Sequence, residues 1–312
     1  MPNAPTEYRF LVDEASLGLG ELERAEVEAA LDNLAEQLSL ARERHEAAGI
    51  ISGFELFECR PGVLLYELLT SDEISRDCRV RIFGLLDKCG RFDTHASFYV
   101  DPNVEVDGHP VESYAIATVL ETQRSAVAIG AFGLVPPYGP GVVKVADASG
   151  DGQAVVVTGL ESRLAFYRWI YATEDVEEAR FFNLVPLAFP YLRFAEGITF
   201  RRFEGSYADL RDQVVFHLGK INDGFRTAYV DHYGRPDEVS AAMDLDISME
   251  STNTRKSERL MRERDATYDG RTYRCEWHSK IEPHRNRIHL HPGDDLSDHC
   301  VVVGIFVKHL ST

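Results

Sequence analysis

The sequence predicts an α+β protein: a helix-rich N-terminal α/β domain followed by a C-terminal α+β domain with a short antiparallel sheet. Two observations lead to this prediction. Helical segments with 3.6-residue apolar spacing alternate with short strands over the N-terminal part. Three strand-like segments then follow one another near the end, which is typical of antiparallel strands joined by turns. The length of 312 residues is sufficient for two domains of ordinary size.

The N-terminal part contains helices and a few short strands. The clearest helix is Glu21–Gly49, whose leucines recur at helical spacing without an intervening proline. Valine-rich runs around a Ser-Gly-Asp-Gly turn predict a β-hairpin over Val142–Gly159. Further helices are expected at Gly62–Leu69, Arg76–Gly90, Glu112–Ser125 and Glu161–Ala172, and strands at Tyr8–Leu11 and Ile51–Glu58.

A proline-containing aromatic segment ends near residue 195, where we place the boundary between an acidic accessory α/β domain (1–195) and an α+β domain (196–312). The second domain is expected to begin with a strand and to continue with helices and then three strands. The predicted strands are Ile198–Phe203, Tyr273–Ile281, Arg287–His291 and Cys300–Val307, and the predicted helices are Tyr207–Val230, Arg235–Met243 and Ser251–Asp265.

The net charge of −18 is unevenly distributed. Residues 1–195 hold 16 Lys and Arg against 31 Asp and Glu, a balance of −15, whereas residues 196–312 hold 17 against 20, a balance of −3. This acidity excludes a general nucleic-acid coat protein. Five scattered cysteines without CxxC spacing favour reduced thiols over a cysteine zinc site. With neither an apolar run of about 20 residues nor a signal-peptide pattern, we expect a cytoplasmic protein without a membrane partner.

Charged residues and histidines alternate with apolar residues on two predicted strands. Successive strand side chains point to opposite faces, so Arg274, Glu276, His278 and Lys280 are expected on one face of the first strand. On the next strand, Arg287, His289 and His291 alternate with Ile288 and Leu290. Such alternation is typical of any sheet with one solvated face, so the face is either an ordinary wet surface or a site.

The segment that carries this alternation also resembles a known family. From Trp277 it reads "WHSKIEPHRNRIHLHPGDD", and it continues to Leu310 with "CVVVGIFVKHL". This is similar to the C-terminal half of the RelE/YoeB-like toxins, which are ribosome-dependent messenger-RNA endoribonucleases. The resemblance implies a RelE-like fold for residues 196–312, RNA or the ribosome as partner, and a role as a toxin or antiviral effector. It implies functional positions at Glu276 or Lys280, at Arg287 and at His309.

Metal-independent RNA cleavage needs a base for the 2′-hydroxyl proton, cations for the charge growing on the phosphate, and an acid for the departing oxygen. Glu276 is the candidate base, and Arg287 and Lys280 are candidate phosphate ligands. His309 or His289 is the candidate acid, since an imidazole titrates close to neutral pH. RNA-binding residues are expected to be Arg274 together with Arg255, Arg259 and Arg262, which are spaced i, i+4, i+7 on one helical face.

Two other functions remain open. His289 and His291, with His278 from the neighbouring strand, could hold a divalent transition metal in a metal-dependent hydrolase or nuclease. Alternatively, the chain is a non-enzymatic interaction protein whose acidic N-terminal half binds a protein partner or inhibitor. If the chain is an enzyme, the acidic half is expected to cover part of the basic C-terminal face and to hold the activity low until a trigger or partner separates the two.

Overall fold

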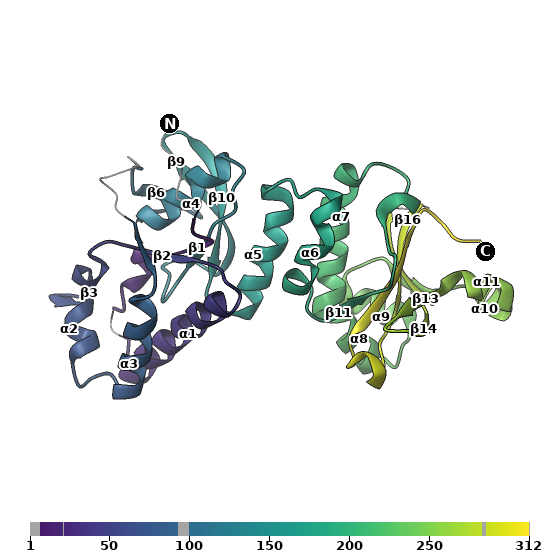
Figure 1. Cartoon of the computed structure of the whole chain (residues 1–312), viewed down its shortest axis with the longest axis horizontal. Helices are drawn as coiled ribbons and strands as arrows, with labels where there is room; N and C mark the ends of the chain where they lie inside the picture. The colour runs from purple at the N-terminus through teal and green to yellow at the C-terminus, as the bar shows by residue number, and fades with distance from the viewer. Residues whose placement is uncertain (1–6, 21, 93–99, 283–284, 312) are drawn as a thin grey trace. The chain divides into compact units, whose positions relative to one another are not determined.

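The computed structural model describes residues 7–20, 22–92, 100–282 and 285–311 (Figure 1). The chain forms two compact units, Met1–Asp175 (unit 1) and Val176–Thr312 (unit 2), and both helices and strands occur in each, so the α+β class is confirmed. The predicted boundary at residue 195 is too late. Helix α6 (Glu178–Ala188) and strand β11 (Leu192–Phe194) belong to unit 2, because β11 pairs in parallel with the last strand, β17 (Val301–Val307).

Unit 1 is built on an eight-stranded mixed sheet of order β5-β2-β1-β8-β10-β9-β6-β7. The pairs from β5 to β10 are parallel, and β9, β6 and β7 extend the sheet in antiparallel fashion. The predicted hairpin is confirmed as β9 and β10. The strands are β1 (Phe10–Val12), β2 (Ala48–Ile51), β5 (Gly90–Phe92), β6 (Asn103–Val106), β7 (His109–Glu112), β8 (Gly130–Phe132), β9 (Gly141–Asp147) and β10 (Gly150–Val157).

The helices of unit 1 follow the predicted order. They are α1 (Arg24–Glu43), α2 (Leu65–Thr70), α3 (Arg76–Leu86), α4 (Tyr114–Arg124) and α5 (Leu160–Thr173). Leu31, Leu34 and Leu38 of α1 are buried, as their spacing predicts. The strand predicted at Ile51–Glu58 is wrong beyond Ile51: Gly53 takes a left-handed conformation (φ 77°), and the chain continues as a 3₁₀ turn, η2 (Phe54–Leu56), before the small β3 (Glu58–Arg60) and β4 (Val63–Leu64) hairpin.

Two acidic residues are buried where β1 ends. The Asp13 carboxylate accepts hydrogen bonds from the Ser113 hydroxyl at 2.7 Å and from the Tyr138 hydroxyl. The Glu14 carboxylate accepts from the backbone N–H groups of Tyr114 and Ala115, in the first turn of α4. Burial, reinforced by the neighbouring Asp13, raises the pKa of Glu14 to about 8. These carboxylates fasten the end of β1 to the start of α4.

Unit 2 is built on a five-stranded sheet of order β11-β17-β16-β15-β12. Its remaining strands are β12 (Ile247–Met249), β15 (Trp277–Glu282) and β16 (Arg285–His291), and every pair except β11 with β17 is antiparallel. All seven residues of β17 are buried, as expected of an interior strand. The predicted strand at Ile198–Phe203 is wrong, because Phe200–Arg202 forms a 3₁₀ turn and β11 lies a few residues earlier.

Helices cover one face of this sheet. Helix α7 (Tyr207–Lys220) begins at Ser206, whose hydroxyl accepts from the backbone N–H of Asp209, and continues through a π-turn, η4 (Ile221–Phe225), into α8 (Arg226–Asp231). The Phe225 ring packs edge-on against Trp277, with centroids 5.4 Å apart. Trp277 is therefore a core residue. After α8 the chain forms α9 (Pro236–Met243), at a position where the sequence predicts a helix.

Two predicted elements of unit 2 are interrupted. The predicted strand Tyr273–Ile281 is divided, since its first residues belong to the separate hairpin of β13 (Asp265–Tyr268) and β14 (Arg271–Arg274). The predicted helix Ser251–Asp265 breaks at Ser257, which has extended backbone angles. It becomes α10 (Thr252–Lys256), α11 (Glu258–Met261) and the 3₁₀ turn η5 (Arg262–Arg264).

Candidate functional site

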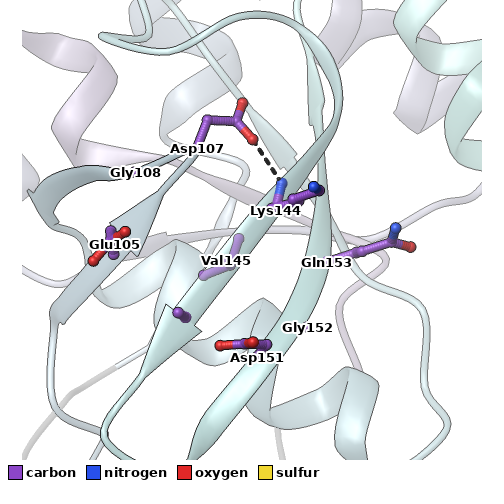
Figure 2. A pocket seen from close by; sticks show the side chains of 9 residues that line it. Glu105, Asp107, Gly108, Lys144, Val145, Asp151, Gly152 and Gln153 are labelled. Carbon is purple, nitrogen blue, oxygen red and sulfur yellow. Dashed lines mark hydrogen bonds between the residues drawn. The ribbon is translucent and has the colours of Figure 1, made fainter.

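A cavity of about 770 Å³ lies on the outer face of β6, β9 and β10 in unit 1 (Figure 2). Its polar lining includes Glu105, Asp107, Lys144 and Asp151, and Asp107 accepts a hydrogen bond from the backbone N–H of Lys144 at 2.9 Å. These residues are exposed, and among the described residues no buried, unpartnered polar atom belongs to this cavity. We therefore assign it no function.

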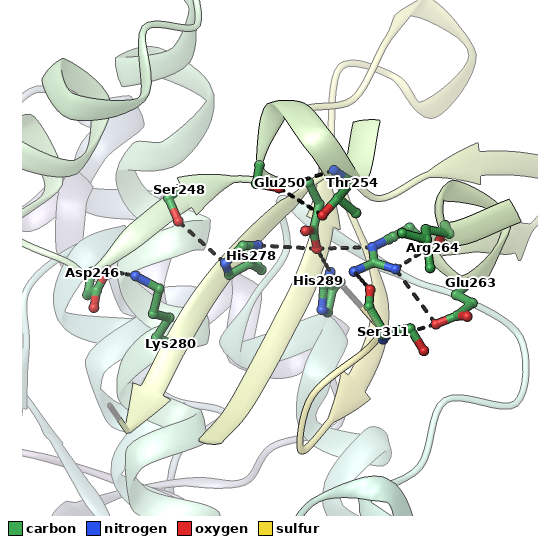
Figure 3. Close-up of polar contacts among 12 residues, drawn as sticks. Asp246, Ser248, Glu250, Thr254, Glu263, Arg264, His278, Lys280, His289 and Ser311 are labelled. Atoms are coloured by element: carbon green, nitrogen blue, oxygen red, sulfur yellow. Dashed lines mark hydrogen bonds and ion pairs between the residues drawn. The ribbon is translucent and has the colours of Figure 1, made fainter. Parts of the chain in front are cut away.

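The polar face of the unit 2 sheet carries the candidate site. Two cross-strand pairs lie next to each other on β15 and β16: His278 opposite His289, and Lys280 opposite Arg287. The imidazole centroids are 5.3 Å apart. The Lys280 ammonium pairs with the Asp246 carboxylate at 2.8 Å (Figure 3). The sequence-predicted alternation thus places these four side chains together on one face.

Glu250 lies at the centre of this face, directly after β12 (Figure 3). Its Oε1 atom is 3.7 Å from Nδ1 of His278 and 3.8 Å from Nδ1 of His289. The Nε atom of Arg264 lies 3.0 Å from the same oxygen. All four side chains are almost completely buried, with Arg264 and His289 at 0% exposure. The face is therefore a packed polar cluster rather than a solvated surface.

Three of the four nitrogens of these two imidazoles lack a hydrogen-bond partner among the described residues. Among the described residues, Nδ1 of His278 and both ring nitrogens of His289 are buried without one, as is Nε of Arg287. Only Nε2 of His278 has a partner, the Ser248 hydroxyl at 3.4 Å. Burial, with the nearby Arg287, lowers the pKa of His278 to about 3, and burial holds the pKa of His289 well below its usual range. Both imidazoles are therefore neutral at physiological pH.

The charges around the imidazoles balance. Arg264 is next to Glu250 and also 3.7 Å from Glu263, and its guanidinium donates to the backbone oxygen of Ser311 at 2.8 Å. Burial lowers the pKa of the half-buried Arg287, and Glu250 counteracts that effect. Three carboxylates thus accompany three cationic side chains: Asp246, Glu250 and Glu263 with Arg264, Lys280 and Arg287.

The predicted catalytic residues divide into two groups. Glu276 is four residues before Lys280, which corresponds to about 13 Å along an extended chain, and it acts electrostatically on His291 instead. His309 is exposed and follows β17 two residues after Val307, the strand neighbour of Arg287. The structure therefore places His309 near the Lys280–Arg287 end of the sheet and Glu276 toward the opposite end.

The predicted metal ligands are only partly brought together. His278 and His289 are neighbours, but the His291 ring packs against Tyr273 at 5.4 Å, and its Nδ1 accepts the backbone N–H of Gly293. Glu250 takes the third place instead, since one ligand atom from each of Glu250, His278 and His289 lies within 4.8 Å of the others.

The predicted RNA-binding arginines do not share one helical face. Arg255, Arg259 and Arg262 are exposed, but they lie on three short elements because the chain breaks at Ser257. Arg274 forms ion pairs with carboxylates on either side: 3.0 Å to Glu258 and 2.9 Å to Asp265. A role of these arginines in RNA binding stays a prediction.

Sequence reasoning missed Glu250 and Arg264. Asp246, Ser248 and Glu250 alternate around the short apolar β12, which is a weak strand signal. Nothing in the arginine-rich segment distinguishes the buried Arg264 from its exposed neighbours, because its burial depends on tertiary contacts with Glu250 and Ser311.

Comparison of the chain with protein-family models, with curated proteins and with solved structures found no match in any of the three. In the part of the chain that the structure describes, none of the helices combines the length and apolar character that crossing a membrane requires.

Proposed function

We propose that unit 2 is a metal-independent RNA endonuclease of the RelE-like kind, with Lys280 and Arg287 as phosphate ligands and His309 as the proton donor. The observation that carries this proposal is the direct pairing of Lys280 on β15 with Arg287 on β16. His309 follows the neighbouring strand, β17, at the same end of the sheet. Two cations side by side suit a phosphate group, and the planar guanidinium can donate two hydrogen bonds to it.

The base for the 2′-hydroxyl must lie close to this pair. Glu276 lies about 13 Å from Lys280 by strand spacing, whereas the exposed carboxylate of Asp246 is 2.8 Å from the Lys280 ammonium. We therefore assign the base to Asp246. It takes the 2′-hydroxyl proton, the 2′-oxygen attacks phosphorus, and His309 gives a proton to the departing 5′-oxygen. The products are a 2′,3′-cyclic phosphate and a 5′-hydroxyl end, and the reaction requires no co-reactant.

The substrate class is RNA, free or on the ribosome, and we expect the reaction to take place in the cytoplasm. The biological role that suits this activity is that of a toxin or an antiviral effector. Unit 1 contributes most of the net negative charge, and on this proposal it binds a protein partner or inhibitor, or restrains the Lys280–Arg287 pair of unit 2.

The test is RNA cleavage by the purified full chain, with and without ribosomes and with and without EDTA. Arg287→Ala and Lys280→Ala should each lower the cleavage rate by about 10²–10³-fold, because each removes a charge that stabilises the transition state. Arg285→Ala is the matched control, since this exposed arginine lies on the same strand and pairs with Glu282 at 2.6 Å. Full activity of Arg287→Ala would refute the phosphate role.

EDTA separates the remaining candidates. Cleavage that survives EDTA supports the proposal. Cleavage that EDTA abolishes while circular dichroism shows the chain still folded favours the metal-dependent hydrolase that the Glu250–His278–His289 cluster could form. If no RNA is cleaved under any of these conditions, the non-enzymatic interaction protein becomes the better account.

A further inference from the structure

We propose that Glu250, His278 and His289 bind one divalent transition metal ion, with zinc as the reference metal. The inference concerns binding at the buried middle of the sheet face and does not depend on the proposed RNA cleavage at its Lys280–Arg287 end. Glu250 is carried by the segment after β12, His278 by β15 and His289 by β16, so three adjacent strand segments hold the ligands (Figure 3).

The ligand atoms are nearly at the separations that zinc requires. With zinc bonds of about 2.0–2.1 Å, two ligand atoms on a tetrahedral ion lie about 3.3 Å apart. Oε1 of Glu250 is 3.7 Å from Nδ1 of His278 and 3.8 Å from Nδ1 of His289. The three ligand atoms all lie within 4.8 Å of one another, so side-chain shifts of about 0.5–1.5 Å would close the site around an ion.

The buried imidazole nitrogens without hydrogen-bond partners favour a bound metal ion. Leaving a buried polar atom without a partner costs about 1–3 kcal/mol, so buried imidazoles normally have hydrogen bonds or metals. Among the described residues, Nδ1 of His278 and both nitrogens of His289 have no hydrogen bond of normal geometry, and the backbone of Cys275 is at most a weak partner for one nitrogen of His289. A metal would use the Nδ1 lone pair of each ring, so one bound ion would provide two of these three atoms with a partner.

The contacts of His278 and Glu250 leave each side chain with a lone pair that can bind a metal. Nε2 of His278 is 3.4 Å from the Ser248 hydroxyl, and a proton on Nε2 leaves the Nδ1 lone pair free for a metal. Arg264 occupies one position on Oε1 of Glu250 at 3.0 Å, and a carboxylate has further lone pairs for a metal. Arg264 thereby orients the carboxylate, as outer hydrogen-bonding groups commonly do at metal sites.

The chemistry of the ligands selects the metal. Two imidazoles and one carboxylate suit zinc, copper, nickel and iron, whereas magnesium and calcium require mostly oxygen ligands.

The experiment is titration of zinc into the EDTA-treated full chain, followed by calorimetry and by elemental analysis after dialysis. We expect one zinc per chain and a rise in melting temperature that EDTA reverses, because a ligand that binds only the folded state stabilises it. Cobalt(II) should give the visible absorption of a low-symmetry nitrogen and oxygen site. A wild-type chain that binds no stoichiometric zinc or cobalt would overturn the proposal without recourse to any variant.

Variants identify the ligands. His278→Asn, His289→Asn and Glu250→Gln should each weaken zinc binding by at least tenfold, whereas His291→Asn should leave it unchanged. His291 is the matched control, because it lies two residues from His289 on the same strand but contacts Tyr273 and Gly293 instead. Equal zinc affinity in the wild type and all three ligand variants would assign the metal to another place and refute the site.

The two proposals can fail separately. Arg287→Ala should keep its zinc affinity even where it loses RNA cleavage, since Arg287 is not among the three ligands. Zinc binding without any RNA cleavage would refute the nuclease and leave the metal site standing. RNA cleavage without any zinc binding would do the reverse.

Discussion

Replacement of Glu14 by glutamine should make unit 1 less sensitive to rising pH. Burial raises the pKa of Glu14 from its usual value of 4.5 to about 8 in the folded chain. Between these two values the folded state holds one more proton than the unfolded state. The stabilisation is complete below pH 4.5 and is lost as the pH rises toward 8. Glutamine keeps an oxygen for the N–H groups of Tyr114 and Ala115 but has no proton to lose.

The magnitude follows from the size of the shift. One proton of difference changes the free energy of unfolding by about 1.4 kcal/mol per pH unit, which amounts to about 5 kcal/mol at most over the whole interval. The variant should therefore match the wild type near pH 5 and exceed it increasingly up to pH 8. Asp13 still titrates in both chains, since burial also raises its pKa, so the variant keeps part of the pH dependence.

The assay can read unit 1 alone. The chain has two tryptophans: Trp169 on α5 of unit 1 and Trp277 on β15 of unit 2. In a Trp277→Phe background, urea unfolding followed by fluorescence at several pH values reports on the surroundings of Trp169. Glu161→Gln, at an exposed position in the first turn of α5, is the control. Equal slopes of unfolding free energy against pH in the Glu14→Gln and wild-type chains would refute the reasoning.

Three further substitutions test the packing of unit 2, each by urea unfolding. Trp277→Ala should cost about 3–5 kcal/mol, because the indole is only 2% exposed, and a cost below 1 kcal/mol would contradict its place in the core. Arg264→Leu should cost about 3–5 kcal/mol, because it leaves the buried Glu250 carboxylate without its partner, and an unchanged stability would show that the ion pair is not formed. Gly293→Ala should cost about 1–3 kcal/mol, since φ is +83° and the added Cβ would lie 2.2 Å from a backbone oxygen. Gly270→Ala has a similar φ of +68° but open space around the Cβ, so the difference between the two glycines measures the steric part alone.

The sequence correctly predicted those helices and strands whose own residues carry a clear periodic pattern or turn. Amphipathic spacing located α1 and α7, and the valine-rich runs around a glycine turn located β9 and β10. Elements fixed by distant partners were misplaced. β11 is only three residues long and is defined by its pairing with β17, so neither its position nor the boundary between the units could be read from nearby residues.

The candidate site shows the same division. The period-two alternation correctly grouped His278 with Lys280 and Arg287 with His289, because one strand fixes each pair. Extending the pattern to Arg274 failed, since the chain changes sheets after β14. Glu250 reaches the cluster through a strand pairing that no local spacing encodes. The position of the boundary also matters for experiments on fragments. A fragment that represents unit 2 should begin at Val176 and not at Glu196, because the later start would delete β11.

The parallel pairing of β11 with β17 determines when the sheet of unit 2 can be completed during translation. Residues 195–300 separate the two strands, and at about 5–20 residues per second the ribosome needs roughly 5–20 s to produce this interval. During that time β11 has no neighbour in the sheet, and β16 lacks the strand that follows it. The segment with His309 emerges later still, after β17. On the proposed function, the ribosome that makes the chain therefore meets a complete RNA-cleaving face only after almost all of unit 2 has been translated.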